Sequence, residues 1–504
     1  MKKSDILDHP QRQSQFAIIF IVLRFLKNLA KQLWPLLLAV MLGRRGSSTF
    51  DTIEMIVAGV GIIGVVPSII AYYKYYFHLS ENELVINKGL LKKVKLNIPF
   101  ERIQSVNFRQ TFLHQFFKVT EVEIETAGSS DQETKIDALD IPTAELLRKR
   151  ILELKAQATQ DGGSLSLATE EAEQVAETET ILRLTERDLL KVGLVQNHIR
   201  PIGLLIGLIA PIYFYTFSFD FNPNSLIREV YSYFDDFQNV TPLIALIVGI
   251  GILIVAVLYS LVTTVLRHYN LHFWRSGEKF QVVRGLFTKQ EFAALDNKIQ
   301  ILNWGQNPFE RIIGFYNIIF SQAKSGDSKS DAAKFEIPGC SMEQVNFVQE
   351  AWLGIKGLNF DEYRTVSPHL FYHTAIYQVL FLSIPMVVFF YLGKPMVVAL
   401  FLLFLTTSLY LSWLNYKKKK YAFNDKEIYI GGGTVGLRHS LLPLYKIQDV
   451  NIRENPYQWR RGLSTLVVNT AGGAIKIPYI PREEAISMMD ELVYRVEVSK
   501  RSWM

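Results

Sequence analysis

Uncharged apolar runs dominate the pattern along this chain. Five of them are long enough, at about 1.5 Å per helical residue, to cross the ~30 Å hydrocarbon core of a bilayer. They are Met55–Tyr73, Pro201–Phe219, Pro242–Leu266, Thr374–Gly393 and Pro395–Tyr416. Soluble domains rarely need so many such runs, so the pattern predicts a multi-pass membrane protein.

A sixth span is expected near the N-terminus, and two segments compete for it. The apolar run 33–43 is short and follows Lys27 and Lys31, which can snorkel from a tilted helix. The run 16–25 contains Arg24 and is either an interfacial helix or the true first span. No small-residue cleavage site follows, so we expect an uncleaved membrane entry. Six spans would pair as three hairpins.

The polar regions between the hairpins alternate as strands do. Glu83–Asn87 and Lys93–Ile98 flank a glycine that supplies the positive φ of a hairpin turn. Each region ends in an Ile-Pro step followed by helical periodicity. The predicted helices are Thr143–Gln157, Ser341–Leu353 and Arg482–Val496. The predicted unit is therefore several antiparallel strands closed by one C-terminal helix.

An internal repeat underlies this organisation. Three glycines each precede a glutamine by fifteen residues, and an asparagine follows each glutamine three residues later. These residues, the repeat signature, are Gly89, Gln104, Asn107, Gly285, Gln300, Asn303, Gly433, Gln448 and Asn451. The chain therefore carries three copies of one unit, each preceded by a membrane hairpin.

Charges beside the spans predict the orientation. Lys74, Arg267 and the run 417–420 make the same side of each hairpin basic, and a basic side is normally cytoplasmic. The connection 220–239 carries four acidic residues against Arg228 alone, so it belongs outside. All three polar units are then expected in the cytoplasm.

Composition narrows the class further. The net charge of +6 is modest for 504 residues, and the basic residues gather beside spans, so membrane topology explains them better than nucleic-acid binding. The single cysteine, Cys340, excludes an intramolecular disulfide framework and suits a reducing cytosol. Residues 158–180 are rich in Gly, Ser, Thr, Gln and Glu, which is typical of a flexible acidic linker.

The repeat signature permits two interpretations. A glutamine and an asparagine three residues apart offer donors and acceptors for a binding edge shared by every copy. The same amides can satisfy unpaired backbone groups where a loop enters β-structure, and we favour this structural role.

Other polar motifs favour packing over chemistry. The pairs His369/His373 and His268/His272 have metal-ligand spacing on a helix but no third ligand or catalytic glutamate between them. The glycine run 431–436 lacks the Lys-Ser/Thr step of a phosphate loop. We therefore expect no catalytic residue, no metal site and no cofactor.

Several motifs together resemble a known family. The membrane hairpin, the turns Gly89-Leu90 and Gly285-Leu286, the Ile-Gln step and the strand ends Thr126-Ala127-Gly128 and Thr470-Ala471-Gly472 are similar to those of bacterial pleckstrin-homology (PH) membrane proteins, in particular the YdbT-like group. The middle copy departs with Gln322-Ala323-Lys324. The resemblance implies three PH-like antiparallel β-barrels of about seven strands, each capped by a helix, and no catalytic residues.

With this resemblance, the fold class expected is an α+β membrane protein of six transmembrane helices alternating with three PH-like barrels. The expected order is an interfacial helix with hairpin 1 (1–74), PH-like domain 1 (75–157), the linker (158–180), an interfacial helix with hairpin 2 (181–267), PH-like domain 2 (268–356), hairpin 3 (357–416) and PH-like domain 3 (417–504).

Basic residues at the first turn suggest lipid contact, because PH folds commonly use that turn to hold phosphates. The candidates there are Lys88, Lys92, Lys93 and Lys95, and beside the last span they are Lys417, Lys418, Lys419 and Lys420. The other copies offer fewer cations at this turn, so nonspecific attraction to acidic headgroups is the milder interpretation.

These observations predict a scaffold or adaptor in the bacterial inner membrane that presents its cytoplasmic domains to protein partners, acidic lipid or both. The alternative is a transporter or channel regulated by the PH-like domains, although the five clear spans contain no charged residue. The partner and the oligomeric state are not predicted.

Overall fold

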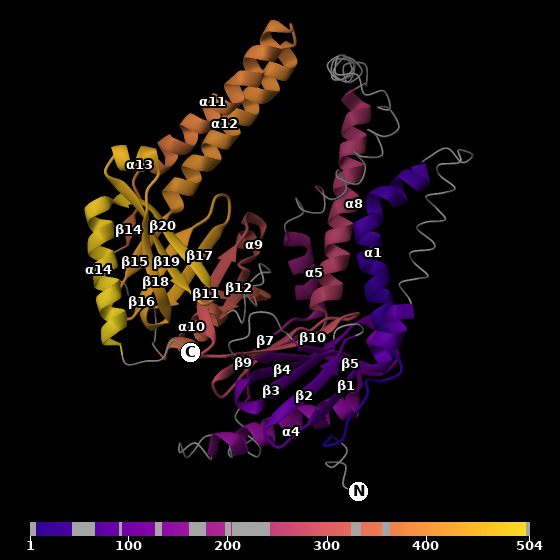
Figure 1. Ribbon diagram of the computed structural model, residues 1–504. Coiled ribbons are helices and arrows are strands. Elements are labelled where there is room, and N and C mark those ends of the chain that lie inside the picture. Colours follow the sequence, from indigo (N-terminus) through magenta and orange to yellow (C-terminus); the bar gives the residue numbers. More distant parts are fainter. Residues whose placement is uncertain are drawn as a thin grey trace. The chain divides into compact units, whose positions relative to one another are not determined.

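The computed structural model describes residues 7–42, 66–89, 93–126, 134–160, 178–196, 203, 242–323, 334–354 and 363–499 (Figure 1). These residues belong to two units. The first comprises residues 1–179, 274–293 and 325–331, and the second comprises 180–273, 294–324 and 332–504.

The first unit contains copy 1 of the repeat and most of the first three strands of copy 2. Copy 1 consists of β1 (Tyr76–Leu79), β2 (Glu83–Lys88), β3 (Val94–Pro99), the 3-10 turn η2 (Phe100–Arg102), β4 (Ile103–Gln110), α3 (Phe112–Phe116), β5 (Val119–Thr126), β6 (Thr134–Asp140) and α4 (Ile141–Gln160). Copy 2 adds most of β8 (His272–Ser276), all of β9 (Lys279–Arg284) and nearly all of β10 (Lys289–Leu295). Helix α1 (Ala17–Leu42) precedes copy 1.

Copy 1 has its core between its strands and α4. Phe77, Leu84, Val122 and Ile136 are fully buried in it, and α4 contributes Ala144, Leu147 and Ile151. The spacing of these three residues is that of one helical face, which explains why the chain forms a helix here. The predicted helix Thr143–Gln157 is thus present and extends to Gln160.

The second unit contains the rest of copy 2 and all of copy 3. Copy 2 supplies the start of β8 and then β11 (Ile299–Gln306), α9 (Pro308–Ile313), β12 (Tyr316–Gln322), β13 (Lys334–Cys340) and α10 (Met342–Leu353). Copy 3 consists of β15 (Lys420–Phe423), β16 (Glu427–Gly432), β17 (Leu437–Pro443), the 3-10 turn η4 (Leu444–Lys446), β18 (Ile447–Arg453), α13 (Pro456–Arg460), β19 (Leu463–Thr470), β20 (Gly473–Pro481) and α14 (Arg482–Val498). The remaining elements are β7 (Thr178–Arg183), α5 (Glu186–Val195), α8 (Pro242–His268), β14 (Arg364–Thr365), α11 (His369–Tyr391) and α12 (Pro395–Lys418).

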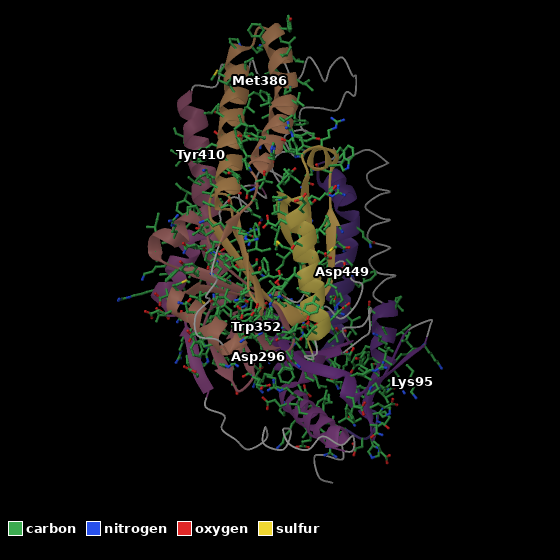
Figure 2. The ribbon with its side chains drawn as sticks, turned by 90° about the vertical axis from the view of Figure 1, so that its left-hand side faces the viewer. Lys95, Asp296, Trp352, Met386, Tyr410 and Asp449 are labelled. Carbon is green, nitrogen blue, oxygen red and sulfur yellow. The ribbon has the colours of Figure 1, made fainter. Side chains whose placement is uncertain are left out.

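Each helix that closes a copy is fixed to its strands. In copy 2, Ser341 caps α10 in a capping box with Gln344. The indole nitrogen of Trp352 donates to the carbonyl of Asp296 at 3.2 Å (Figure 2). In copy 3, α14 buries Ala485, Met488 and Leu492 in the domain core. These two helices match the predicted Ser341–Leu353 and Arg482–Val496 within two residues.

Strands of successive copies pair with one another. In the first unit β4 pairs antiparallel with β10, with Gln110 opposite Lys289. In the second unit β11 pairs antiparallel with β17, with Gln306 opposite Leu437. In both cases the fourth strand of one copy pairs with the third strand of the next.

This pairing explains why the described strands do not close into the predicted barrels. The second unit has one sheet in the order β13-β12-β11-β17-β16-β15-β14 and another in the order β18-β19-β20, and both are open. A short turn separates the third and fourth strands in every copy: η2 in copy 1, residues 296–298 in copy 2 and η4 in copy 3. In copies 1 and 2 the fourth strand then pairs with the following copy. The strands and the α+β class are as predicted, but the copies share sheets.

The glycine turn is confirmed in all three copies. Gly89, Gly285 and Gly433 have φ values of 116°, 107° and 113°, which a residue with a side chain rarely adopts. Each follows the second strand of its copy, where the sequence pattern placed the hairpin.

Both candidates for the first span lie on a single helix, α1. The run 16–25 does not face lipid alone, because Ala17 and Phe20 pack with Val119 and Ala138 in a small core, and the ring of Phe20 stacks on His114 at 3.7 Å. The predicted span Met55–Tyr73, apart from 66–73, and the span Pro201–Phe219, apart from 203, lie outside the described residues.

Three described helices are long and apolar enough to cross a membrane: Gly249–His268 within α8, His369–Tyr391 and Pro395–Lys418. They correspond to the fourth, fifth and sixth predicted spans. Where an interfacial helix was predicted before hairpin 2, the structure has β7 and then α5. Gly193 of α5 lies so close to Leu261 of α8 that an added Cβ would meet that side chain at 2.6 Å, so α5 packs tightly on α8.

Most of the predicted linker 158–180 also lies outside the described residues. Its ends are regular structure, because α4 continues to Gln160 and β7 begins at Thr178.

The joint between β11 and β17 predicts the effect of a small substitution. A Cβ added at Gly305 would lie 2.5 Å from the carbonyl oxygen of Leu437, a backbone atom that cannot turn away. We expect Gly305→Ala to lower the free energy of unfolding by about 1–3 kcal/mol, as overpacking does. Thermal unfolding of the purified full chain measures this. Gly251→Ala in α8, where nothing lies within 4 Å of the added atom, is the matched control. Equal stability of the two variants would contradict the close approach.

Candidate functional site

The helical hairpin α11–α12 presents an apolar surface outward. Phe381 and Tyr391 are 77% and 84% exposed, and Met386 and Tyr410 are carried on the same two helices (Figure 2). The described polar link between the helices is the hydrogen bond from Gln378 Nε2 to Ser412 Oγ at 2.8 Å. Helices with so much exposed apolar surface are stable in lipid and unsuited to water.

Lys418 connects the end of α12 to domain 3 through hydrogen bonds. Its Nζ donates to the carbonyl oxygens of Thr434, Val435 and Gly436 at 2.7, 2.8 and 3.2 Å. These carbonyls belong to the glycine turn between β16 and β17. An ammonium group has three donors, and all three acceptors here are backbone atoms. Lys418 is therefore engaged with protein and is not a free headgroup ligand.

The histidine pair His369/His373 connects helix α11 to the same domain through contacts with aromatic residues. His369 Nδ1 lies 2.9 Å from the hydroxyl of Tyr457 in α13, and the His373 ring lies 4.8 Å from the Tyr457 ring. His373 also contacts the ring of Tyr479 on β20 at 5.8 Å. In the described residues no group of three His, Cys, Asp or Glu side chains is arranged to hold a metal. The pair thus packs on aromatic rings of domain 3.

The second pair, His268/His272, lies at the end of α8. His268 is buried, and His272 Nε2 lies 3.3 Å from the hydroxyl of Thr180 in β7. This pair also contacts neighbouring protein elements.

A groove of about 1060 Å³ lies in the second unit, along the joint of β11 and β17. The glycine turn and the start of β20 also line it. Its lining is mixed, with amides from Asn303 and Asn317 and carboxylates from Glu310 and Glu336. The cations that line it are Lys419, Arg438 and Lys476. Such a lining can hydrogen-bond and pair with charged groups of either sign.

Asn303 of the repeat signature connects two strands that line the groove. Its side chain donates to Ser321 Oγ on β12 at 3.3 Å and accepts from Ser440 Oγ on β17 at 2.6 Å. The structure places the signature asparagines on the fourth strands, not in loops, and Asn303 bonds side chains of two neighbouring strands.

The remaining signature residues differ between copies. Gln300 and Asn107 are buried, whereas Gln448 and Asn451 are exposed on β18. The side chain of Gln104 lies outside the described residues. The asparagine position is thus buried in copy 1 and the glutamine position in copy 2, whereas both positions are exposed in copy 3.

Two aromatic side chains that line the groove, Trp304 and His439, belong to one cluster with Tyr429. The ring of His439 stacks on Trp304 at 5.2 Å, and its Nδ1 lies 2.6 Å from the hydroxyl of Tyr429. Burial lowers the pKa of His439 and raises the pKa of Tyr429 to about 12, so both are neutral near pH 7.

The predicted headgroup lysines do not form one site. Lys93 and Lys95 are exposed and Lys88 is half-buried, while Lys92 lies outside the described residues. Lys417 is exposed beside the rings of Trp413 and Tyr416, and Lys420 is exposed at the start of β15. Burial, and then the nearby Arg438, lower the pKa of Lys419, which lines the groove.

Two features escaped the sequence analysis. A short helix follows the fourth strand in every copy, and Asn307 and Asn455 cap it in copies 2 and 3 through capping boxes with Glu310 and Gln458. The Asn-Pro step that copies 2 and 3 share, Asn307-Pro308 and Asn455-Pro456, was the available signal, because a capping asparagine before proline starts a helix.

The second feature that the sequence pattern did not predict is the burial of Lys446 of η4. This lysine is fully buried and donates to the carbonyl of Asn297. Burial lowers its pKa to about 8 despite the opposing effect of Asp296. Its apolar neighbours Leu444 and Ile447 were the only hint of burial in the sequence.

The chain belongs to a known family. A family model described as the bacterial PH domain matches residues 18–155, 230–354 and 379–496, which is more than half of the chain. The protein is therefore a member of the bacterial PH domain family, as the sequence motifs indicated. The first match begins within α1 and the third within α11, so the family unit includes a helix before the strands.

A curated relative agrees with this assignment. The chain is 23% identical over 420 residues to the UPF0699 transmembrane protein YdbT of Bacillus subtilis (strain 168), and the alignment covers 80% of both proteins. Together with the apolar helices, the relative supports a membrane protein with bacterial PH domains.

The buried histidine predicts a pH dependence. Burial holds the pKa of His439 below that of a free histidine, which is about 6.5. As the pH falls through this value, the unfolded chain therefore binds a proton at His439 more readily than the folded chain does. This contribution to stability is present above pH ~6.5 and is lost as the pH falls below it. We expect His439→Gln to flatten the decline of unfolding temperature between pH 7.5 and 5.5. Tyr429→Phe removes the hydrogen bond but keeps the titrating ring, so it should leave the slope unchanged. Parallel slopes for wild type and His439→Gln would refute the assignment.

The three hydrogen bonds that Lys418 donates at the end of α12 predict how its substitution changes the local dynamics. We expect Lys418→Met to increase amide hydrogen exchange at residues 434–437 roughly tenfold, because hydrogen bonds from a charged donor contribute on the order of 1 kcal/mol or more. Mass spectrometry of the full chain in detergent measures it. Lys417→Met, which removes a neighbouring exposed cation, should change nothing there. An identical exchange rate in both variants would show that the turn is held by other contacts.

Proposed function

We propose that this protein is a scaffold of the bacterial inner membrane that holds its three PH-like domains at the cytoplasmic face and binds a protein partner. The observation that carries the proposal is the attachment of domain 3 to both helices of its hairpin, through Lys418 on α12 and through His369 and His373 on α11. A loosely tethered domain would need no such contacts. A scaffold requires that the domain keep a fixed orientation to the membrane.

A comparable attachment supports the proposal at copy 2. The segment β7–α5 precedes hairpin 2, and α5 packs on α8. The carbonyl of Val195 at the end of α5 accepts a hydrogen bond from Asn307 Nδ2 at 2.7 Å, and the carbonyl of Ile181 accepts one from Gln344 Nε2 at 2.6 Å. Copy 2 is thus bonded to the segment that leads into its hairpin.

The three-hairpin topology is part of the proposal. The basic residues at the same end of each hairpin support a cytoplasmic location for all three domains. Nonspecific attraction of exposed lysines such as Lys93, Lys95 and Lys420 to acidic headgroups would add to the attachment, at about 1 kcal/mol per cation.

The partner surface that we favour is the groove at the β11–β17 joint. It combines amides, carboxylates and cations on a rigid sheet, which suits a polar protein segment better than an acyl chain. We propose no catalytic, metal or cofactor role. Between Leu370 and Tyr416 the hairpin contains no acidic or basic residue other than His373 and Lys394. It therefore offers few of the charged side chains that transport pathways use.

Charge reversal in the groove tests this proposal. We expect Arg438→Glu combined with Lys476→Glu to deplete a partner from the full-length protein crosslinked and purified from its native membranes, as quantified by mass spectrometry. Lys426→Glu, an exposed reversal at the β15–β16 turn that does not line the groove, is the control and should keep the partner. If the groove variant retains every protein that the control retains, the groove is not the partner surface.

A further inference from the structure

The two strand pairings between copies follow one rule. On the repeat alignment, Gln110 of β4 corresponds to Gln306 of β11, and Lys289 of β10 corresponds to Leu437 of β17. Gln110 lies opposite Lys289, and Gln306 lies opposite Leu437. The register is therefore identical in both pairings, although the residues differ. An interface that recurs in the same register with different side chains is a property of the fold.

Among the described strands, the same rule leaves two with one edge unpaired. In the described residues, β18 of copy 3 is the last strand of the sheet β18-β19-β20, and β3 of copy 1 is the last strand of the sheet β1-β2-β3. β18 is the counterpart of β4 and β11, and β3 is the counterpart of β10 and β17. The described part of the chain thus carries two complementary edges, each of the kind that the other edge binds.

Burial along the fourth strands shows what the pairing does. In β11, Leu302 and Trp304 are 1% and 5% exposed. Their counterparts in β18, Val450 and Ile452, are only partly buried, and Gln448, Asp449, Asn451 and Arg453 alternate with them as exposed residues. An edge strand with open backbone groups and half-covered apolar side chains is a ready template for a further strand.

We propose that β18 binds β3 of a second copy of this protein. The register of the internal joints places Val450 opposite Asn97, Asn451 opposite Leu96, Ile452 opposite Lys95 and Arg453 opposite Val94 of the second copy. Glu454 then lies opposite the exposed Lys93, which gives the contact an opposite-charge pair.

Side chains on β18 are compatible with this contact. Arg453 stands where β11 has Gly305, but β4 has Arg109 at the same position and still pairs, opposite Gln290. The stem of Lys95 would lie over Ile452, where His439 lies over Trp304 in the internal joint.

The contact is head-to-tail, because two different edges meet. Such an interface does not end at a dimer: each added copy leaves one β18 and one β3 edge open, so the assembly grows in the membrane plane or closes as a ring. The three copies within one chain become a segment of a longer series of PH-like domains.

Cysteine crosslinking between differently tagged full-length copies tests this proposal. One copy carries Asn451→Cys and the other Leu96→Cys, both in a Cys340→Ala background, and the membranes are oxidised. Asn303→Cys with Ser440→Cys in one chain is the positive control, because these residues are bonded across the internal joint in the same register. The control on specificity replaces Asn451→Cys by Lys476→Cys, which is exposed on β20.

We expect a disulfide between the two tagged copies for the pair 451/96 and none for the pair 476/96. Because Leu96 is partly buried, a second pair, Arg453→Cys with Val94→Cys, repeats the test at the strand ends. The proposal is overturned if the internal control forms its disulfide and neither intermolecular pair does, or if the disulfide forms only when both cysteines are in one molecule.

Discussion

The pairing of the fourth strand of one copy with the third strand of the next is the contact on which this structure depends. Backbone N–H and C=O groups at a sheet edge must find partners or face water, and here each copy supplies them to its neighbour. The β4–β10 and β11–β17 joints keep one register, and the groove, its asparagine bonds and its aromatic cluster all lie on the second joint. Successive copies are therefore joined through shared sheets as well as through the continuous chain.

The membrane helices extend this connection to the bilayer. α11 and α12 are apolar around their circumference, and the ends of these helices next to domain 3 contact the glycine turn and the aromatic residues of α13 and β20. Polar groups at a helix end are costly to leave unpaired, and Lys418 satisfies three carbonyls of the domain. A domain that is bonded both to its neighbour and to its hairpin has little freedom to rotate, which suits presentation of a fixed surface.

Much of this architecture could be predicted from the sequence, because it rests on local patterns. Apolar runs identified α8, α11 and α12, fixed offsets identified the three copies, and the glycine turn followed from the need for positive φ at Gly89, Gly285 and Gly433. The shared sheets could not be predicted, since a strand's own pattern does not say which edge it will meet. Nor could the burial of Lys446 or the carbonyl contacts of Lys418, because both depend on residues distant in the chain.

Hydrogen exchange in the full-length protein tests the shared-sheet account most directly. If β11 and β17 are neighbours in one sheet, the amides of residues 299–306 and 437–442 are slow to exchange and become faster together when denaturant is added. Exchange of residues 437–442 at the rate of an exposed edge, while residues 299–306 remain protected, would show that the copies do not share a sheet.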